Sequence, residues 1–313
     1  MKDERLIIAV DGGATKTTLV IQSENCRTLF TQTSTGSNYH AIGSERVERV
    51  LSGLLQEAHE AIPFANIEIA TFAMAGIDTD YDLAIIKGVI EKSLSNTPIT
   101  IKTIIIENDV HSTLLGITKG NPGALLLSGT GSICYAYDGQ HQMIRTGGWG
   151  HRAADEGSGY WIGRKILRAV VRFEDGRSSK PTILKQLLFD KLQVKHLDQL
   201  LAWVYHPEYT NAELASISSI ISEAVALGDE AAIEIARSAA KELSILTMAT
   251  LKKLTYLEEP FTVYINGGLL QNHPIIRDLF EQYTLEHFPN LLFELCHKQP
   301  IEYIINRALL ELK

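Results

Sequence analysis

The sequence has few cysteines, no cluster of basic residues and no long apolar stretch. Its 313 residues include only Cys26, Cys134 and Cys296, whose spacing fits neither a disulfide framework nor a metal site, so a reducing cytoplasm is expected. Lys and Arg total 29 against 37 Asp and Glu, a net charge of −8, which makes nucleic acid and anionic membranes poor partners. No apolar run approaches the roughly 20 residues of a membrane helix. The amino-terminal residues pass directly from charges into a predicted strand, so no signal peptide is expected.

Two nucleotide-binding signatures are also missing. The chain contains neither the G-x-x-x-x-G-K-[ST] phosphate loop nor the G-x-G-x-x-G dinucleotide fingerprint, so neither of those folds is predicted. The composition, with 45% apolar and 21% charged residues, is ordinary for a globular protein. The length of 313 residues exceeds what one hydrophobic core usually serves. Two domains are therefore expected.

Apolar runs alternate with amphipathic stretches along the chain. Strands are predicted for short apolar runs, and helices for segments with apolar residues every three to four positions. In the first half the predicted strands are Leu6–Val10, Thr17–Ile21, Cys26–Thr33, Ile67–Phe72 and Ile101–Ile106, and the helices Ser44–Ala61, Tyr81–Ser95 and Val110–Ile117. In the second half the strands are Ala124–Leu127, Ile133–Tyr137, Phe261–Ile265 and Leu291–Leu295, with a helical middle and a terminal helix Ile301–Leu312.

Each half opens on a strand, a Gly/Thr turn and a second strand, which suggests an internal duplication. The breaker-rich residues 119–123 (KGNPG) separate the halves. We therefore predict an α/β protein of two domains around a cleft, residues 1–119 and 120–299, with a helical insertion in the second. The terminal helix, about 300–313, is expected to pack back on the first domain.

The two Gly/Thr turns are candidate phosphate-binding loops. Residues 11–17 read DGGATKT and residues 129–132 read GTGS. Glycines let backbone amides approach phosphate oxygens, and Thr15 and Lys16 can donate to them. Asp11, at a strand end, could hold Mg²⁺ through water. Each turn alone could equally be an ordinary hairpin, but two such units in one chain favour a nucleotide bound between the halves.

Candidate acidic residues follow predicted strands. Asp109 lies where a strand ends and a helix begins, a position that suits a helix N-cap or a general base, and Glu107 is the near alternative. Asp155 and Glu156 come just before a helical pattern, where capping would explain them, but they could also bind hydroxyl groups. Trp149 (residues 147–150, GGWG) could be a core aromatic, but the glycines on both sides favour one wall of a sugar site.

These motifs resemble a known family. The segments DGGATKT, GSN (residues 36–38), GTGS, GGWG, DEGSGYWIG (155–163) and NGGLLQN (266–272) occur in this order in N-acetylglucosamine kinases and related BadF/BadG-type ATPases of the sugar-kinase and actin superfamily. The resemblance spans Val10 to about Asn272. It implies two ribonuclease-H-like (actin-like ATPase) domains, each on a mixed five-stranded sheet, with the active site between them.

The resemblance also implies an activity: an ATP- and Mg²⁺-dependent kinase acting on an amino sugar, N-acetylglucosamine at O6, with glucosamine or N-acetylmuramic acid as alternatives. Asp109 matches the family's catalytic base. The matching sugar-contact positions are Asn38, Asp109, Gly148, Trp149, Asp155 and Glu156. The matching nucleotide positions are Gly12, Gly13, Thr15, Lys16, Gly129, Thr130, Gly131, Gly267 and Gly268. A homodimer is compatible with the resemblance, and Arg152 could face an acidic sugar substituent.

The same superfamily branch contains a different class of protein, the ATPase activators of 2-hydroxyacyl-CoA dehydratases. These share an iron–sulfur cluster across a dimer, which requires two suitably placed cysteines from each chain. None of the three cysteines follows a glycine-rich loop at the start of a helix. The sequence therefore favours the kinase.

Overall fold

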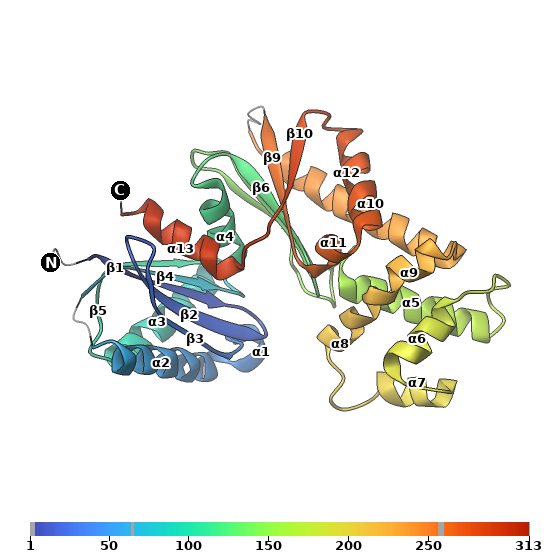
Figure 1. Ribbon diagram of the computed structural model, residues 1–313, viewed down its shortest axis with the longest axis horizontal. Helices are drawn as coiled ribbons and strands as arrows, with labels where there is room; N and C mark the ends of the chain where they lie inside the picture. The colour runs from blue at the N-terminus through green and yellow to red at the C-terminus, as the bar shows by residue number, and fades with distance from the viewer. Residues whose placement is uncertain (1–3, 64–65, 256–259, 313) are drawn as a thin grey trace. The chain divides into compact units, whose positions relative to one another are not determined.

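The computed structural model describes residues 4–63, 66–255 and 260–312. The chain divides into two compact units (Figure 1). Unit 1 comprises Met1–Asn121 with His297–Lys313, and unit 2 comprises Pro122–Cys296. The chain thus leaves unit 1 once and returns to it with its last helix.

Unit 1 is built on a mixed five-stranded sheet in the order β3-β2-β1-β4-β5. The first three strands are antiparallel neighbours, while β4 and β5 run parallel to β1. The strands are β1 (Leu6–Gly12), β2 (Lys16–Ser23), β3 (Thr28–Thr35), β4 (Asn66–Met74) and β5 (Thr100–Glu107). The helices are α1 (Tyr39–Ile42), α2 (Ser44–Ala61), α3 (Asp80–Ser95), α4 (Asp109–Thr118) and α13 (Pro300–Leu310).

Helices cover both faces of this sheet, which explains why β1 is apolar at nearly every position. Ile8 and Val10 pack with residues of α2 and α3 in the main core of the unit. Ile7 and Ala9, which alternate with them along β1, pack against α13 on the opposite face. The backbones of α4 and α13 approach closely there, since a Cβ at Gly116 would lie 1.8 Å from the Tyr303 carbonyl oxygen.

Unit 2 repeats this topology on a sheet in the order β10-β9-β6-β7-β8. Again the first three strands of the unit are antiparallel neighbours, and its fourth and fifth strands run parallel to its first strand. The strands are β6 (Gly123–Ser128), β7 (Ser132–Tyr137), β8 (Met143–Gly147), β9 (Phe261–Asn266) and β10 (Leu291–Leu295). The shared strand order supports the internal duplication that the sequence suggests.

The helices of unit 2 lie mostly between β8 and β9. They are α5 (Gly159–Glu174), α6 (Leu184–Leu192), α7 (Leu197–Val204), α8 (Asn211–Ser216), the 3₁₀ helix η1 (Ile217–Ile220), α9 (Ile221–Ala226), α10 (Glu230–Leu251), α11 (Gly268–Asn272) and α12 (Pro274–Leu285). The apolar faces of α5 and α10 share one buried core with strands β6, β7 and β9. The predicted α/β class with two mixed five-stranded sheets is confirmed.

Two sequence-based assignments differ from the structure. The third strand, expected at Cys26–Thr33, runs from Thr28 to Thr35, because Cys26 has a left-handed backbone (φ 62°) in the turn before it. The edge strand β8 was not predicted, since all five of its residues are only partly buried and it presents no continuous apolar run.

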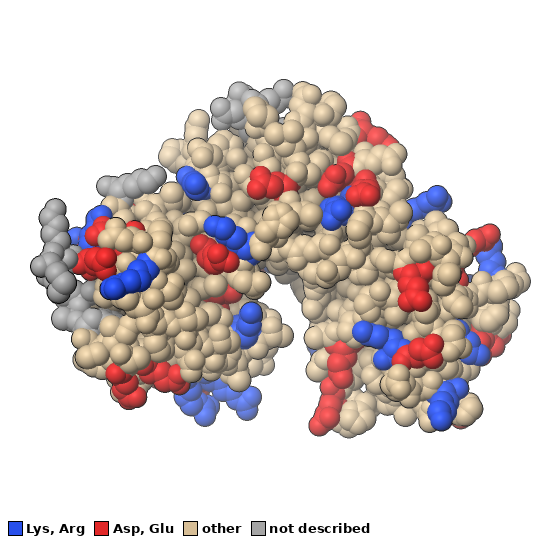
Figure 2. Space-filling model, in the orientation of Figure 1, with Lys and Arg blue, Asp and Glu red and all other residues tan. Residues whose placement is uncertain are grey.

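The lengths of the helices and the distribution of charge on one face can be read from the structure. None of the helices in the described ranges is long and apolar enough to cross a bilayer. On the face drawn in Figure 2, Lys and Arg are interspersed with Asp and Glu, and no broad basic area is visible.

Candidate functional site

The first glycine turn connects β1 to β2 and leaves little room for side chains. A Cβ on Gly12 would lie 2.5 Å from Met74 Sδ, so only glycine fits against the end of β4. The amide of Gly13 donates to the Lys16 carbonyl (3.0 Å) and closes the turn. Thr15 and Lys16 project from it and are exposed. The turn therefore offers a hydroxyl and a cation to a ligand.

Two carboxylates lie close to this turn. Burial raises the pKa of Asp11 to about 6, against the opposing effect of Lys16. Burial, and then the negative charge of Asp11, raise the pKa of Asp109 to about 7. Mutual repulsion of this kind requires the two carboxylates to be near neighbours. A bound cation would reduce the repulsion between the two carboxylates.

The helix-capping role that was an alternative for Asp109 belongs to its neighbour. Asn108 is the N-cap of α4, and its Oδ1 accepts from the amides of Val110 (2.9 Å) and His111 (3.3 Å). Asp109 is the first helical residue, half-buried, and Oδ1 of its carboxylate lies 3.0 Å from the same Val110 amide. Its carboxylate is therefore not needed to cap the helix.

Glu107, the other candidate base, is held by an ion pair. Arg307 of α13 donates through Nη2 to Glu107 Oε1 (2.7 Å) and through Nε to both carboxylate oxygens (3.1 and 3.2 Å). Both side chains are largely buried. Glu107 thus joins the terminal helix to β5, which leaves Asp109 as the candidate base of the two.

Asn38 lies in a short turn that follows β3. It is the N-cap of α1, and its Oδ1 accepts from the amide of His40 (3.0 Å). The same oxygen would lie 3.0 Å from a Cβ on Gly76, so the turn contacts the loop that follows β4. Asn38 is half-buried.

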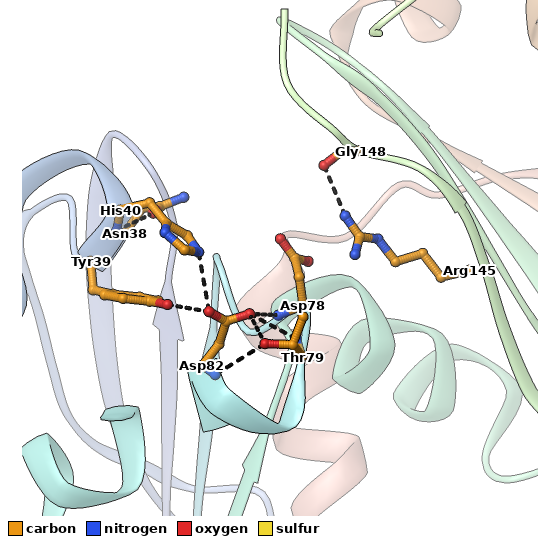
Figure 3. A network of polar contacts seen from close by, with 8 residues as sticks. All are labelled: Asn38, Tyr39, His40, Asp78, Thr79, Asp82, Arg145 and Gly148. Carbon is orange, nitrogen blue, oxygen red and sulfur yellow. Dashed lines mark hydrogen bonds and ion pairs between the residues drawn. The ribbon is translucent and has the colours of Figure 1, made fainter. Parts of the chain in front are cut away.

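A carboxylate that the sequence analysis did not single out joins these two loops (Figure 3). Asp82 of α3 is only 5% exposed. Its Oδ2 accepts from the amides of Asp78 (3.0 Å) and Thr79 (2.7 Å) and from Thr79 Oγ1 (2.8 Å). Its Oδ1 accepts from the Tyr39 hydroxyl and lies 3.4 Å from His40 Nε2.

These contacts explain the electrostatics of the network. Burial favours a raised pKa for Asp82, but the donors from Tyr39, Thr79 and Asp78 hold its pKa below the usual value. Burial and the bond to Asp82 raise the pKa of the Tyr39 hydroxyl. Asp82 therefore stays ionised and fixes the turn that carries Asn38. A signal existed in the sequence, because Thr79-x-x-Asp82 is a capping box.

The second glycine loop, between β6 and β7, is bound to the start of α5. The Gly129 amide donates to the Gly131 carbonyl (3.0 Å), while the amides of Gly159 and Tyr160 donate to the carbonyls of Gly129 (2.8 Å) and Thr130 (3.3 Å). The Thr130 side chain is exposed. This loop is thus held by the helix behind it.

Asp155 does not open the helix. The N-cap of α5 is Ser158, whose Oγ accepts from the Trp161 amide (3.2 Å), so the capping alternative for Asp155 and Glu156 is wrong. Asp155 has a left-handed backbone (φ 70°) and is 8% exposed. Its Oδ1 accepts from the Ser132 amide (3.3 Å). Burial raises its pKa, and the Ser132 bond opposes this.

Asp155 and its neighbour Glu156 face different surroundings. A Cβ on Gly131 would lie 3.0 Å from Asp155 Oδ2, so this carboxylate lies against the glycine loop. The Glu156 side chain is exposed and lines a cavity beside α5 together with Arg152. The backbone of Glu156 contacts the loop region, because its carbonyl accepts from Ser132 Oγ (2.8 Å).

The GGWG turn follows the edge strand β8. Trp149 is 69% exposed, and the Arg145 guanidinium lies 4.9 Å from its ring centroid. Arg145 also donates to the Gly148 carbonyl (2.9 Å; Figure 3). A large exposed aromatic held by a cation can serve as a binding surface for a sugar ring.

Gly267 and Gly268 follow β9. Because Leu127 pairs with Asn266 in parallel register, these glycines lie at the same sheet edge as the 129–131 loop. The Asn266 side chain accepts from the Gly267 amide (2.7 Å) and fixes the turn. Unit 2 thus brings both of its predicted nucleotide segments to one edge.

The chain is similar to several known proteins. An N-acetylmuramic acid/N-acetylglucosamine kinase of Clostridium acetobutylicum is 31% identical over 289 residues, which cover 92% of each chain. An N-acetyl-D-glucosamine kinase of Dictyostelium discoideum is 31% identical over 299 residues, with the same coverage. A solved structure from Chromobacterium violaceum, provisionally named an N-acetylglucosamine kinase, has a TM-score of 0.72 at 22% identity and covers 97% of this chain and 99% of its own.

A more distant structure has the same fold. The ROK hexokinase of Thermus thermophilus superposes with a TM-score of 0.56 at 15% identity, over 97% of both chains. The model of the BadF/BadG/BcrA/BcrD ATPase family matches residues 8–287. A match of this extent, with two relatives at 31% identity over most of the chain, shows that the protein belongs to the BadF/BadG/BcrA/BcrD ATPase family.

Proposed function

We propose that this protein is an ATP-dependent amino-sugar kinase that phosphorylates N-acetylglucosamine at O6. The observation that carries the proposal is the position of Asp109: a half-buried carboxylate with a pKa near 7, beside Asp11 and the glycine turn of β1 and β2. The kinase names of the two 31% identical relatives support the same activity.

In this mechanism Asp109 is the general base. A sugar hydroxyl is a poor nucleophile at neutral pH, and a carboxylate within hydrogen-bonding reach can accept its proton as the new bond forms. The hydroxyl oxygen bonds to the γ-phosphorus, the bond from that phosphorus to the bridging oxygen breaks, and ADP leaves. A pKa near 7 suits the base, because it is ionised at working pH yet basic enough to take the proton.

The glycine loops would supply the donors that phosphoryl transfer requires. In unit 1 these are the amides of Gly12 and Gly13 with Thr15 and Lys16, and in unit 2 those of Gly129, Thr130 and Gly131. Gly267 and Gly268 would border the adenosine.

Mg²⁺ would neutralise the phosphate charge, and Asp11 fits it as an outer ligand through water. The described residues contain no group of three or more His, Cys, Asp or Glu that could form a protein cage. Water and phosphate oxygens would therefore complete the coordination.

The sugar would be held by residues from both units. Asn38 and Asp109 come from unit 1, and Gly148, Trp149 and Asp155 from unit 2. Glu156 is the weakest member of this set, because its side chain lines the cavity beside α5. That one sugar contacts residues of both units, that the protein acts in the cytoplasm and that it forms a homodimer are all predictions.

The test is ADP release over a panel of N-acetylglucosamine, glucosamine, N-acetylmannosamine and N-acetylmuramic acid. Stimulation by N-acetylglucosamine is expected, and phosphorus NMR of the product should show a phosphate ester at O6. Basal ATP hydrolysis that no sugar accelerates would contradict the proposal.

The dehydratase-activator alternative is disfavoured by the cysteines. Cys134 is buried within β7, where burial raises the pKa of its thiol to about 11, and Cys296 is 4% exposed. Cys26 is exposed in the turn before β3. A cluster shared across a dimer requires two accessible thiolates from each chain, and the three described cysteines do not offer such a pair.

A further inference from the structure

The outer face of α5 carries an unusual concentration of positive charge. Its inner face is apolar, and Ile162, Ile166 and Val170 are fully buried. On the outer face, four cationic side chains are exposed, and Glu174 is the only acidic residue of the helix. The four are Arg164, Lys165, Arg168 and Arg172.

These charges have no acidic partners among the residues that the structure describes. Glu174 pairs with Lys185 (2.8 Å) instead, and none of the four cations takes part in an ion pair there. Arg164 and Arg168, and again Arg168 and Arg172, are four residues apart, a spacing at which like charges destabilise a helix. In a protein of net charge −8, this basic cluster is a local feature that the overall composition does not explain.

The cluster lines a concave surface. A cavity of about 260 Å³ lies between α5 and residues 151–156, and its lining includes Arg152, Arg164, Lys165, Arg168 and Glu156. A second cavity of about 250 Å³ continues along α5 and shares Lys165 and Arg168 with the first. We call the first cavity the α5 pocket. Two of its cations are oriented by aromatic rings, Lys165 over Trp161 (4.6 Å) and Arg164 over Tyr160 (5.9 Å).

The chemistry of the lining defines a class of ligand. Arginine guanidinium groups bind phosphate oxygens through paired hydrogen bonds. Four cations line the α5 pocket, and together they favour a ligand with more than one negative charge; they are Arg152, Arg164, Lys165 and Arg168. The Glu156 carboxylate, which can only accept hydrogen bonds, adds a partner for hydroxyl groups. We propose that the α5 pocket binds a phosphorylated sugar.

The position of the α5 pocket connects it to the glycine loop of unit 2. Residues 151–156 include Asp155, which accepts from the Ser132 amide, and Gly159 at the start of α5 donates to Gly129. A ligand in the α5 pocket would therefore contact a segment that is hydrogen-bonded to the predicted phosphate loop, although it would not itself occupy that loop.

The test measures binding of glucosamine 6-phosphate to the full chain by calorimetry, in the absence of nucleotide. The variant is Arg164→Gln with Arg168→Gln, which removes two guanidinium groups outside the proposed catalytic machinery. The matched control is Arg46→Gln, which removes an exposed arginine from a helix of unit 1. We expect two binding events for the wild type and the control, one in the proposed active site and one in the α5 pocket.

In the double variant, one of the two events should weaken by about tenfold or more, because two guanidinium groups that can donate charge-assisted hydrogen bonds to the phosphate are lost. Its kcat and its KM for sugar and for ATP should stay unchanged. Unchanged binding of the sugar phosphate in the double variant would overturn the proposal, as would a raised KM for ATP, since the pocket would then belong to the nucleotide site.

Further ligands test the chemical class. Inorganic phosphate and glucuronate should each bind the α5 pocket at least tenfold more weakly than glucosamine 6-phosphate, because one lacks the sugar hydroxyls and the other the doubly charged phosphate. Equal affinity for either would refute a phosphorylated-sugar site. The measurement requires no turnover, so a protein that phosphorylates no sugar but loses this binding event in the double variant would refute the proposed function and leave the α5 pocket supported.

Discussion

Replacing the proposed base Asp109 should stabilise the folded protein and, at the same time, strongly lower kcat. The pKa of Asp109 is near 7 in the folded protein against an ordinary value of 3.8. Because the folded pKa is the higher one, the contribution of this group to stability is fully present below pH 4 and is lost as the pH rises through about 7. Above pH 7 the wild type must therefore keep an unfavourable charge that Asp109→Asn removes.

The expected gain in stability follows from the pKa shift of Asp109. Three pKa units correspond to about 4 kcal/mol, but Asp109 is half-buried, and solvent screens part of the repulsion. We expect Asp109→Asn to raise the free energy of unfolding by about 2 kcal/mol at pH 8. This corresponds to a rise in Tm of about 4–8 °C, which should vanish near pH 4.

The assay is thermal unfolding of wild type and variant at pH 4, 6 and 8, without Mg²⁺. Glu107→Gln is the matched control, since it changes an acid two residues away but breaks the largely buried pair with Arg307. That variant should lose about 3–5 kcal/mol. A Tm for Asp109→Asn at or below the wild-type value at pH 8 would refute the electrostatic argument.

The same substitution that raises the free energy of unfolding should lower the rate of catalysis. The kcat of Asp109→Asn should fall by about 10²–10⁴, with a modest loss of sugar affinity. In the wild type, kcat/KM should rise with pH to a plateau above about 7, as Asp109 loses its proton. A loss of kcat below tenfold, with both substrate affinities intact, would exclude Asp109 as the base.

Three other substitutions test the surroundings. Asp82→Ala should lower the free energy of unfolding by about 2–3 kcal/mol and raise the KM for sugar more than it lowers kcat; steady-state kinetics that match the wild type would show that the turn does not depend on this carboxylate. Asp155→Asn should weaken sugar binding by roughly 1.5–3 kcal/mol, and unchanged affinity in calorimetry would restrict Asp155 to holding the loop at Ser132. Gly131→Ala, which places a methyl 3.0 Å from Asp155 Oδ2, should raise the KM for ATP, and an unchanged value would argue against that loop as a phosphate site.

The strand and helix order was predictable because the buried strands are apolar at nearly every position. In β1 and β6 the apolar run itself marks the strand, and a glycine turn marks its end. The edge strand β8 carries Arg145 and Thr146, is covered only in part, and gives no such signal. Whether each unit folds by itself, as the predicted domain boundaries imply, stays a prediction.

The roles proposed for the site residues stay predictions, but some of the contacts that hold these residues were hidden from the sequence, because the partner is remote. Asp155 precedes a helix, so local rules suggest a cap, but its partner Ser132 lies 23 residues earlier. Likewise Asp82 contacts Tyr39 from 43 residues away. Hydrogen bonds of this kind depend on how the strands are ordered in the sheet, which composition and periodicity do not encode.

The return of α13 to unit 1 has a consequence for biosynthesis. Strands β1 to β5 leave the ribosome early, but one face of their sheet is covered by a helix that is translated only after the whole of Pro122–Cys296. Unit 2 is continuous and can complete its core first. Until α13 is made, Ile7 and Ala9 lack the helix that buries them, so we expect nascent unit 1 to expose apolar surface that chaperones can bind. A premature stop codon just before Pro300 would therefore damage the part of the protein that was made first.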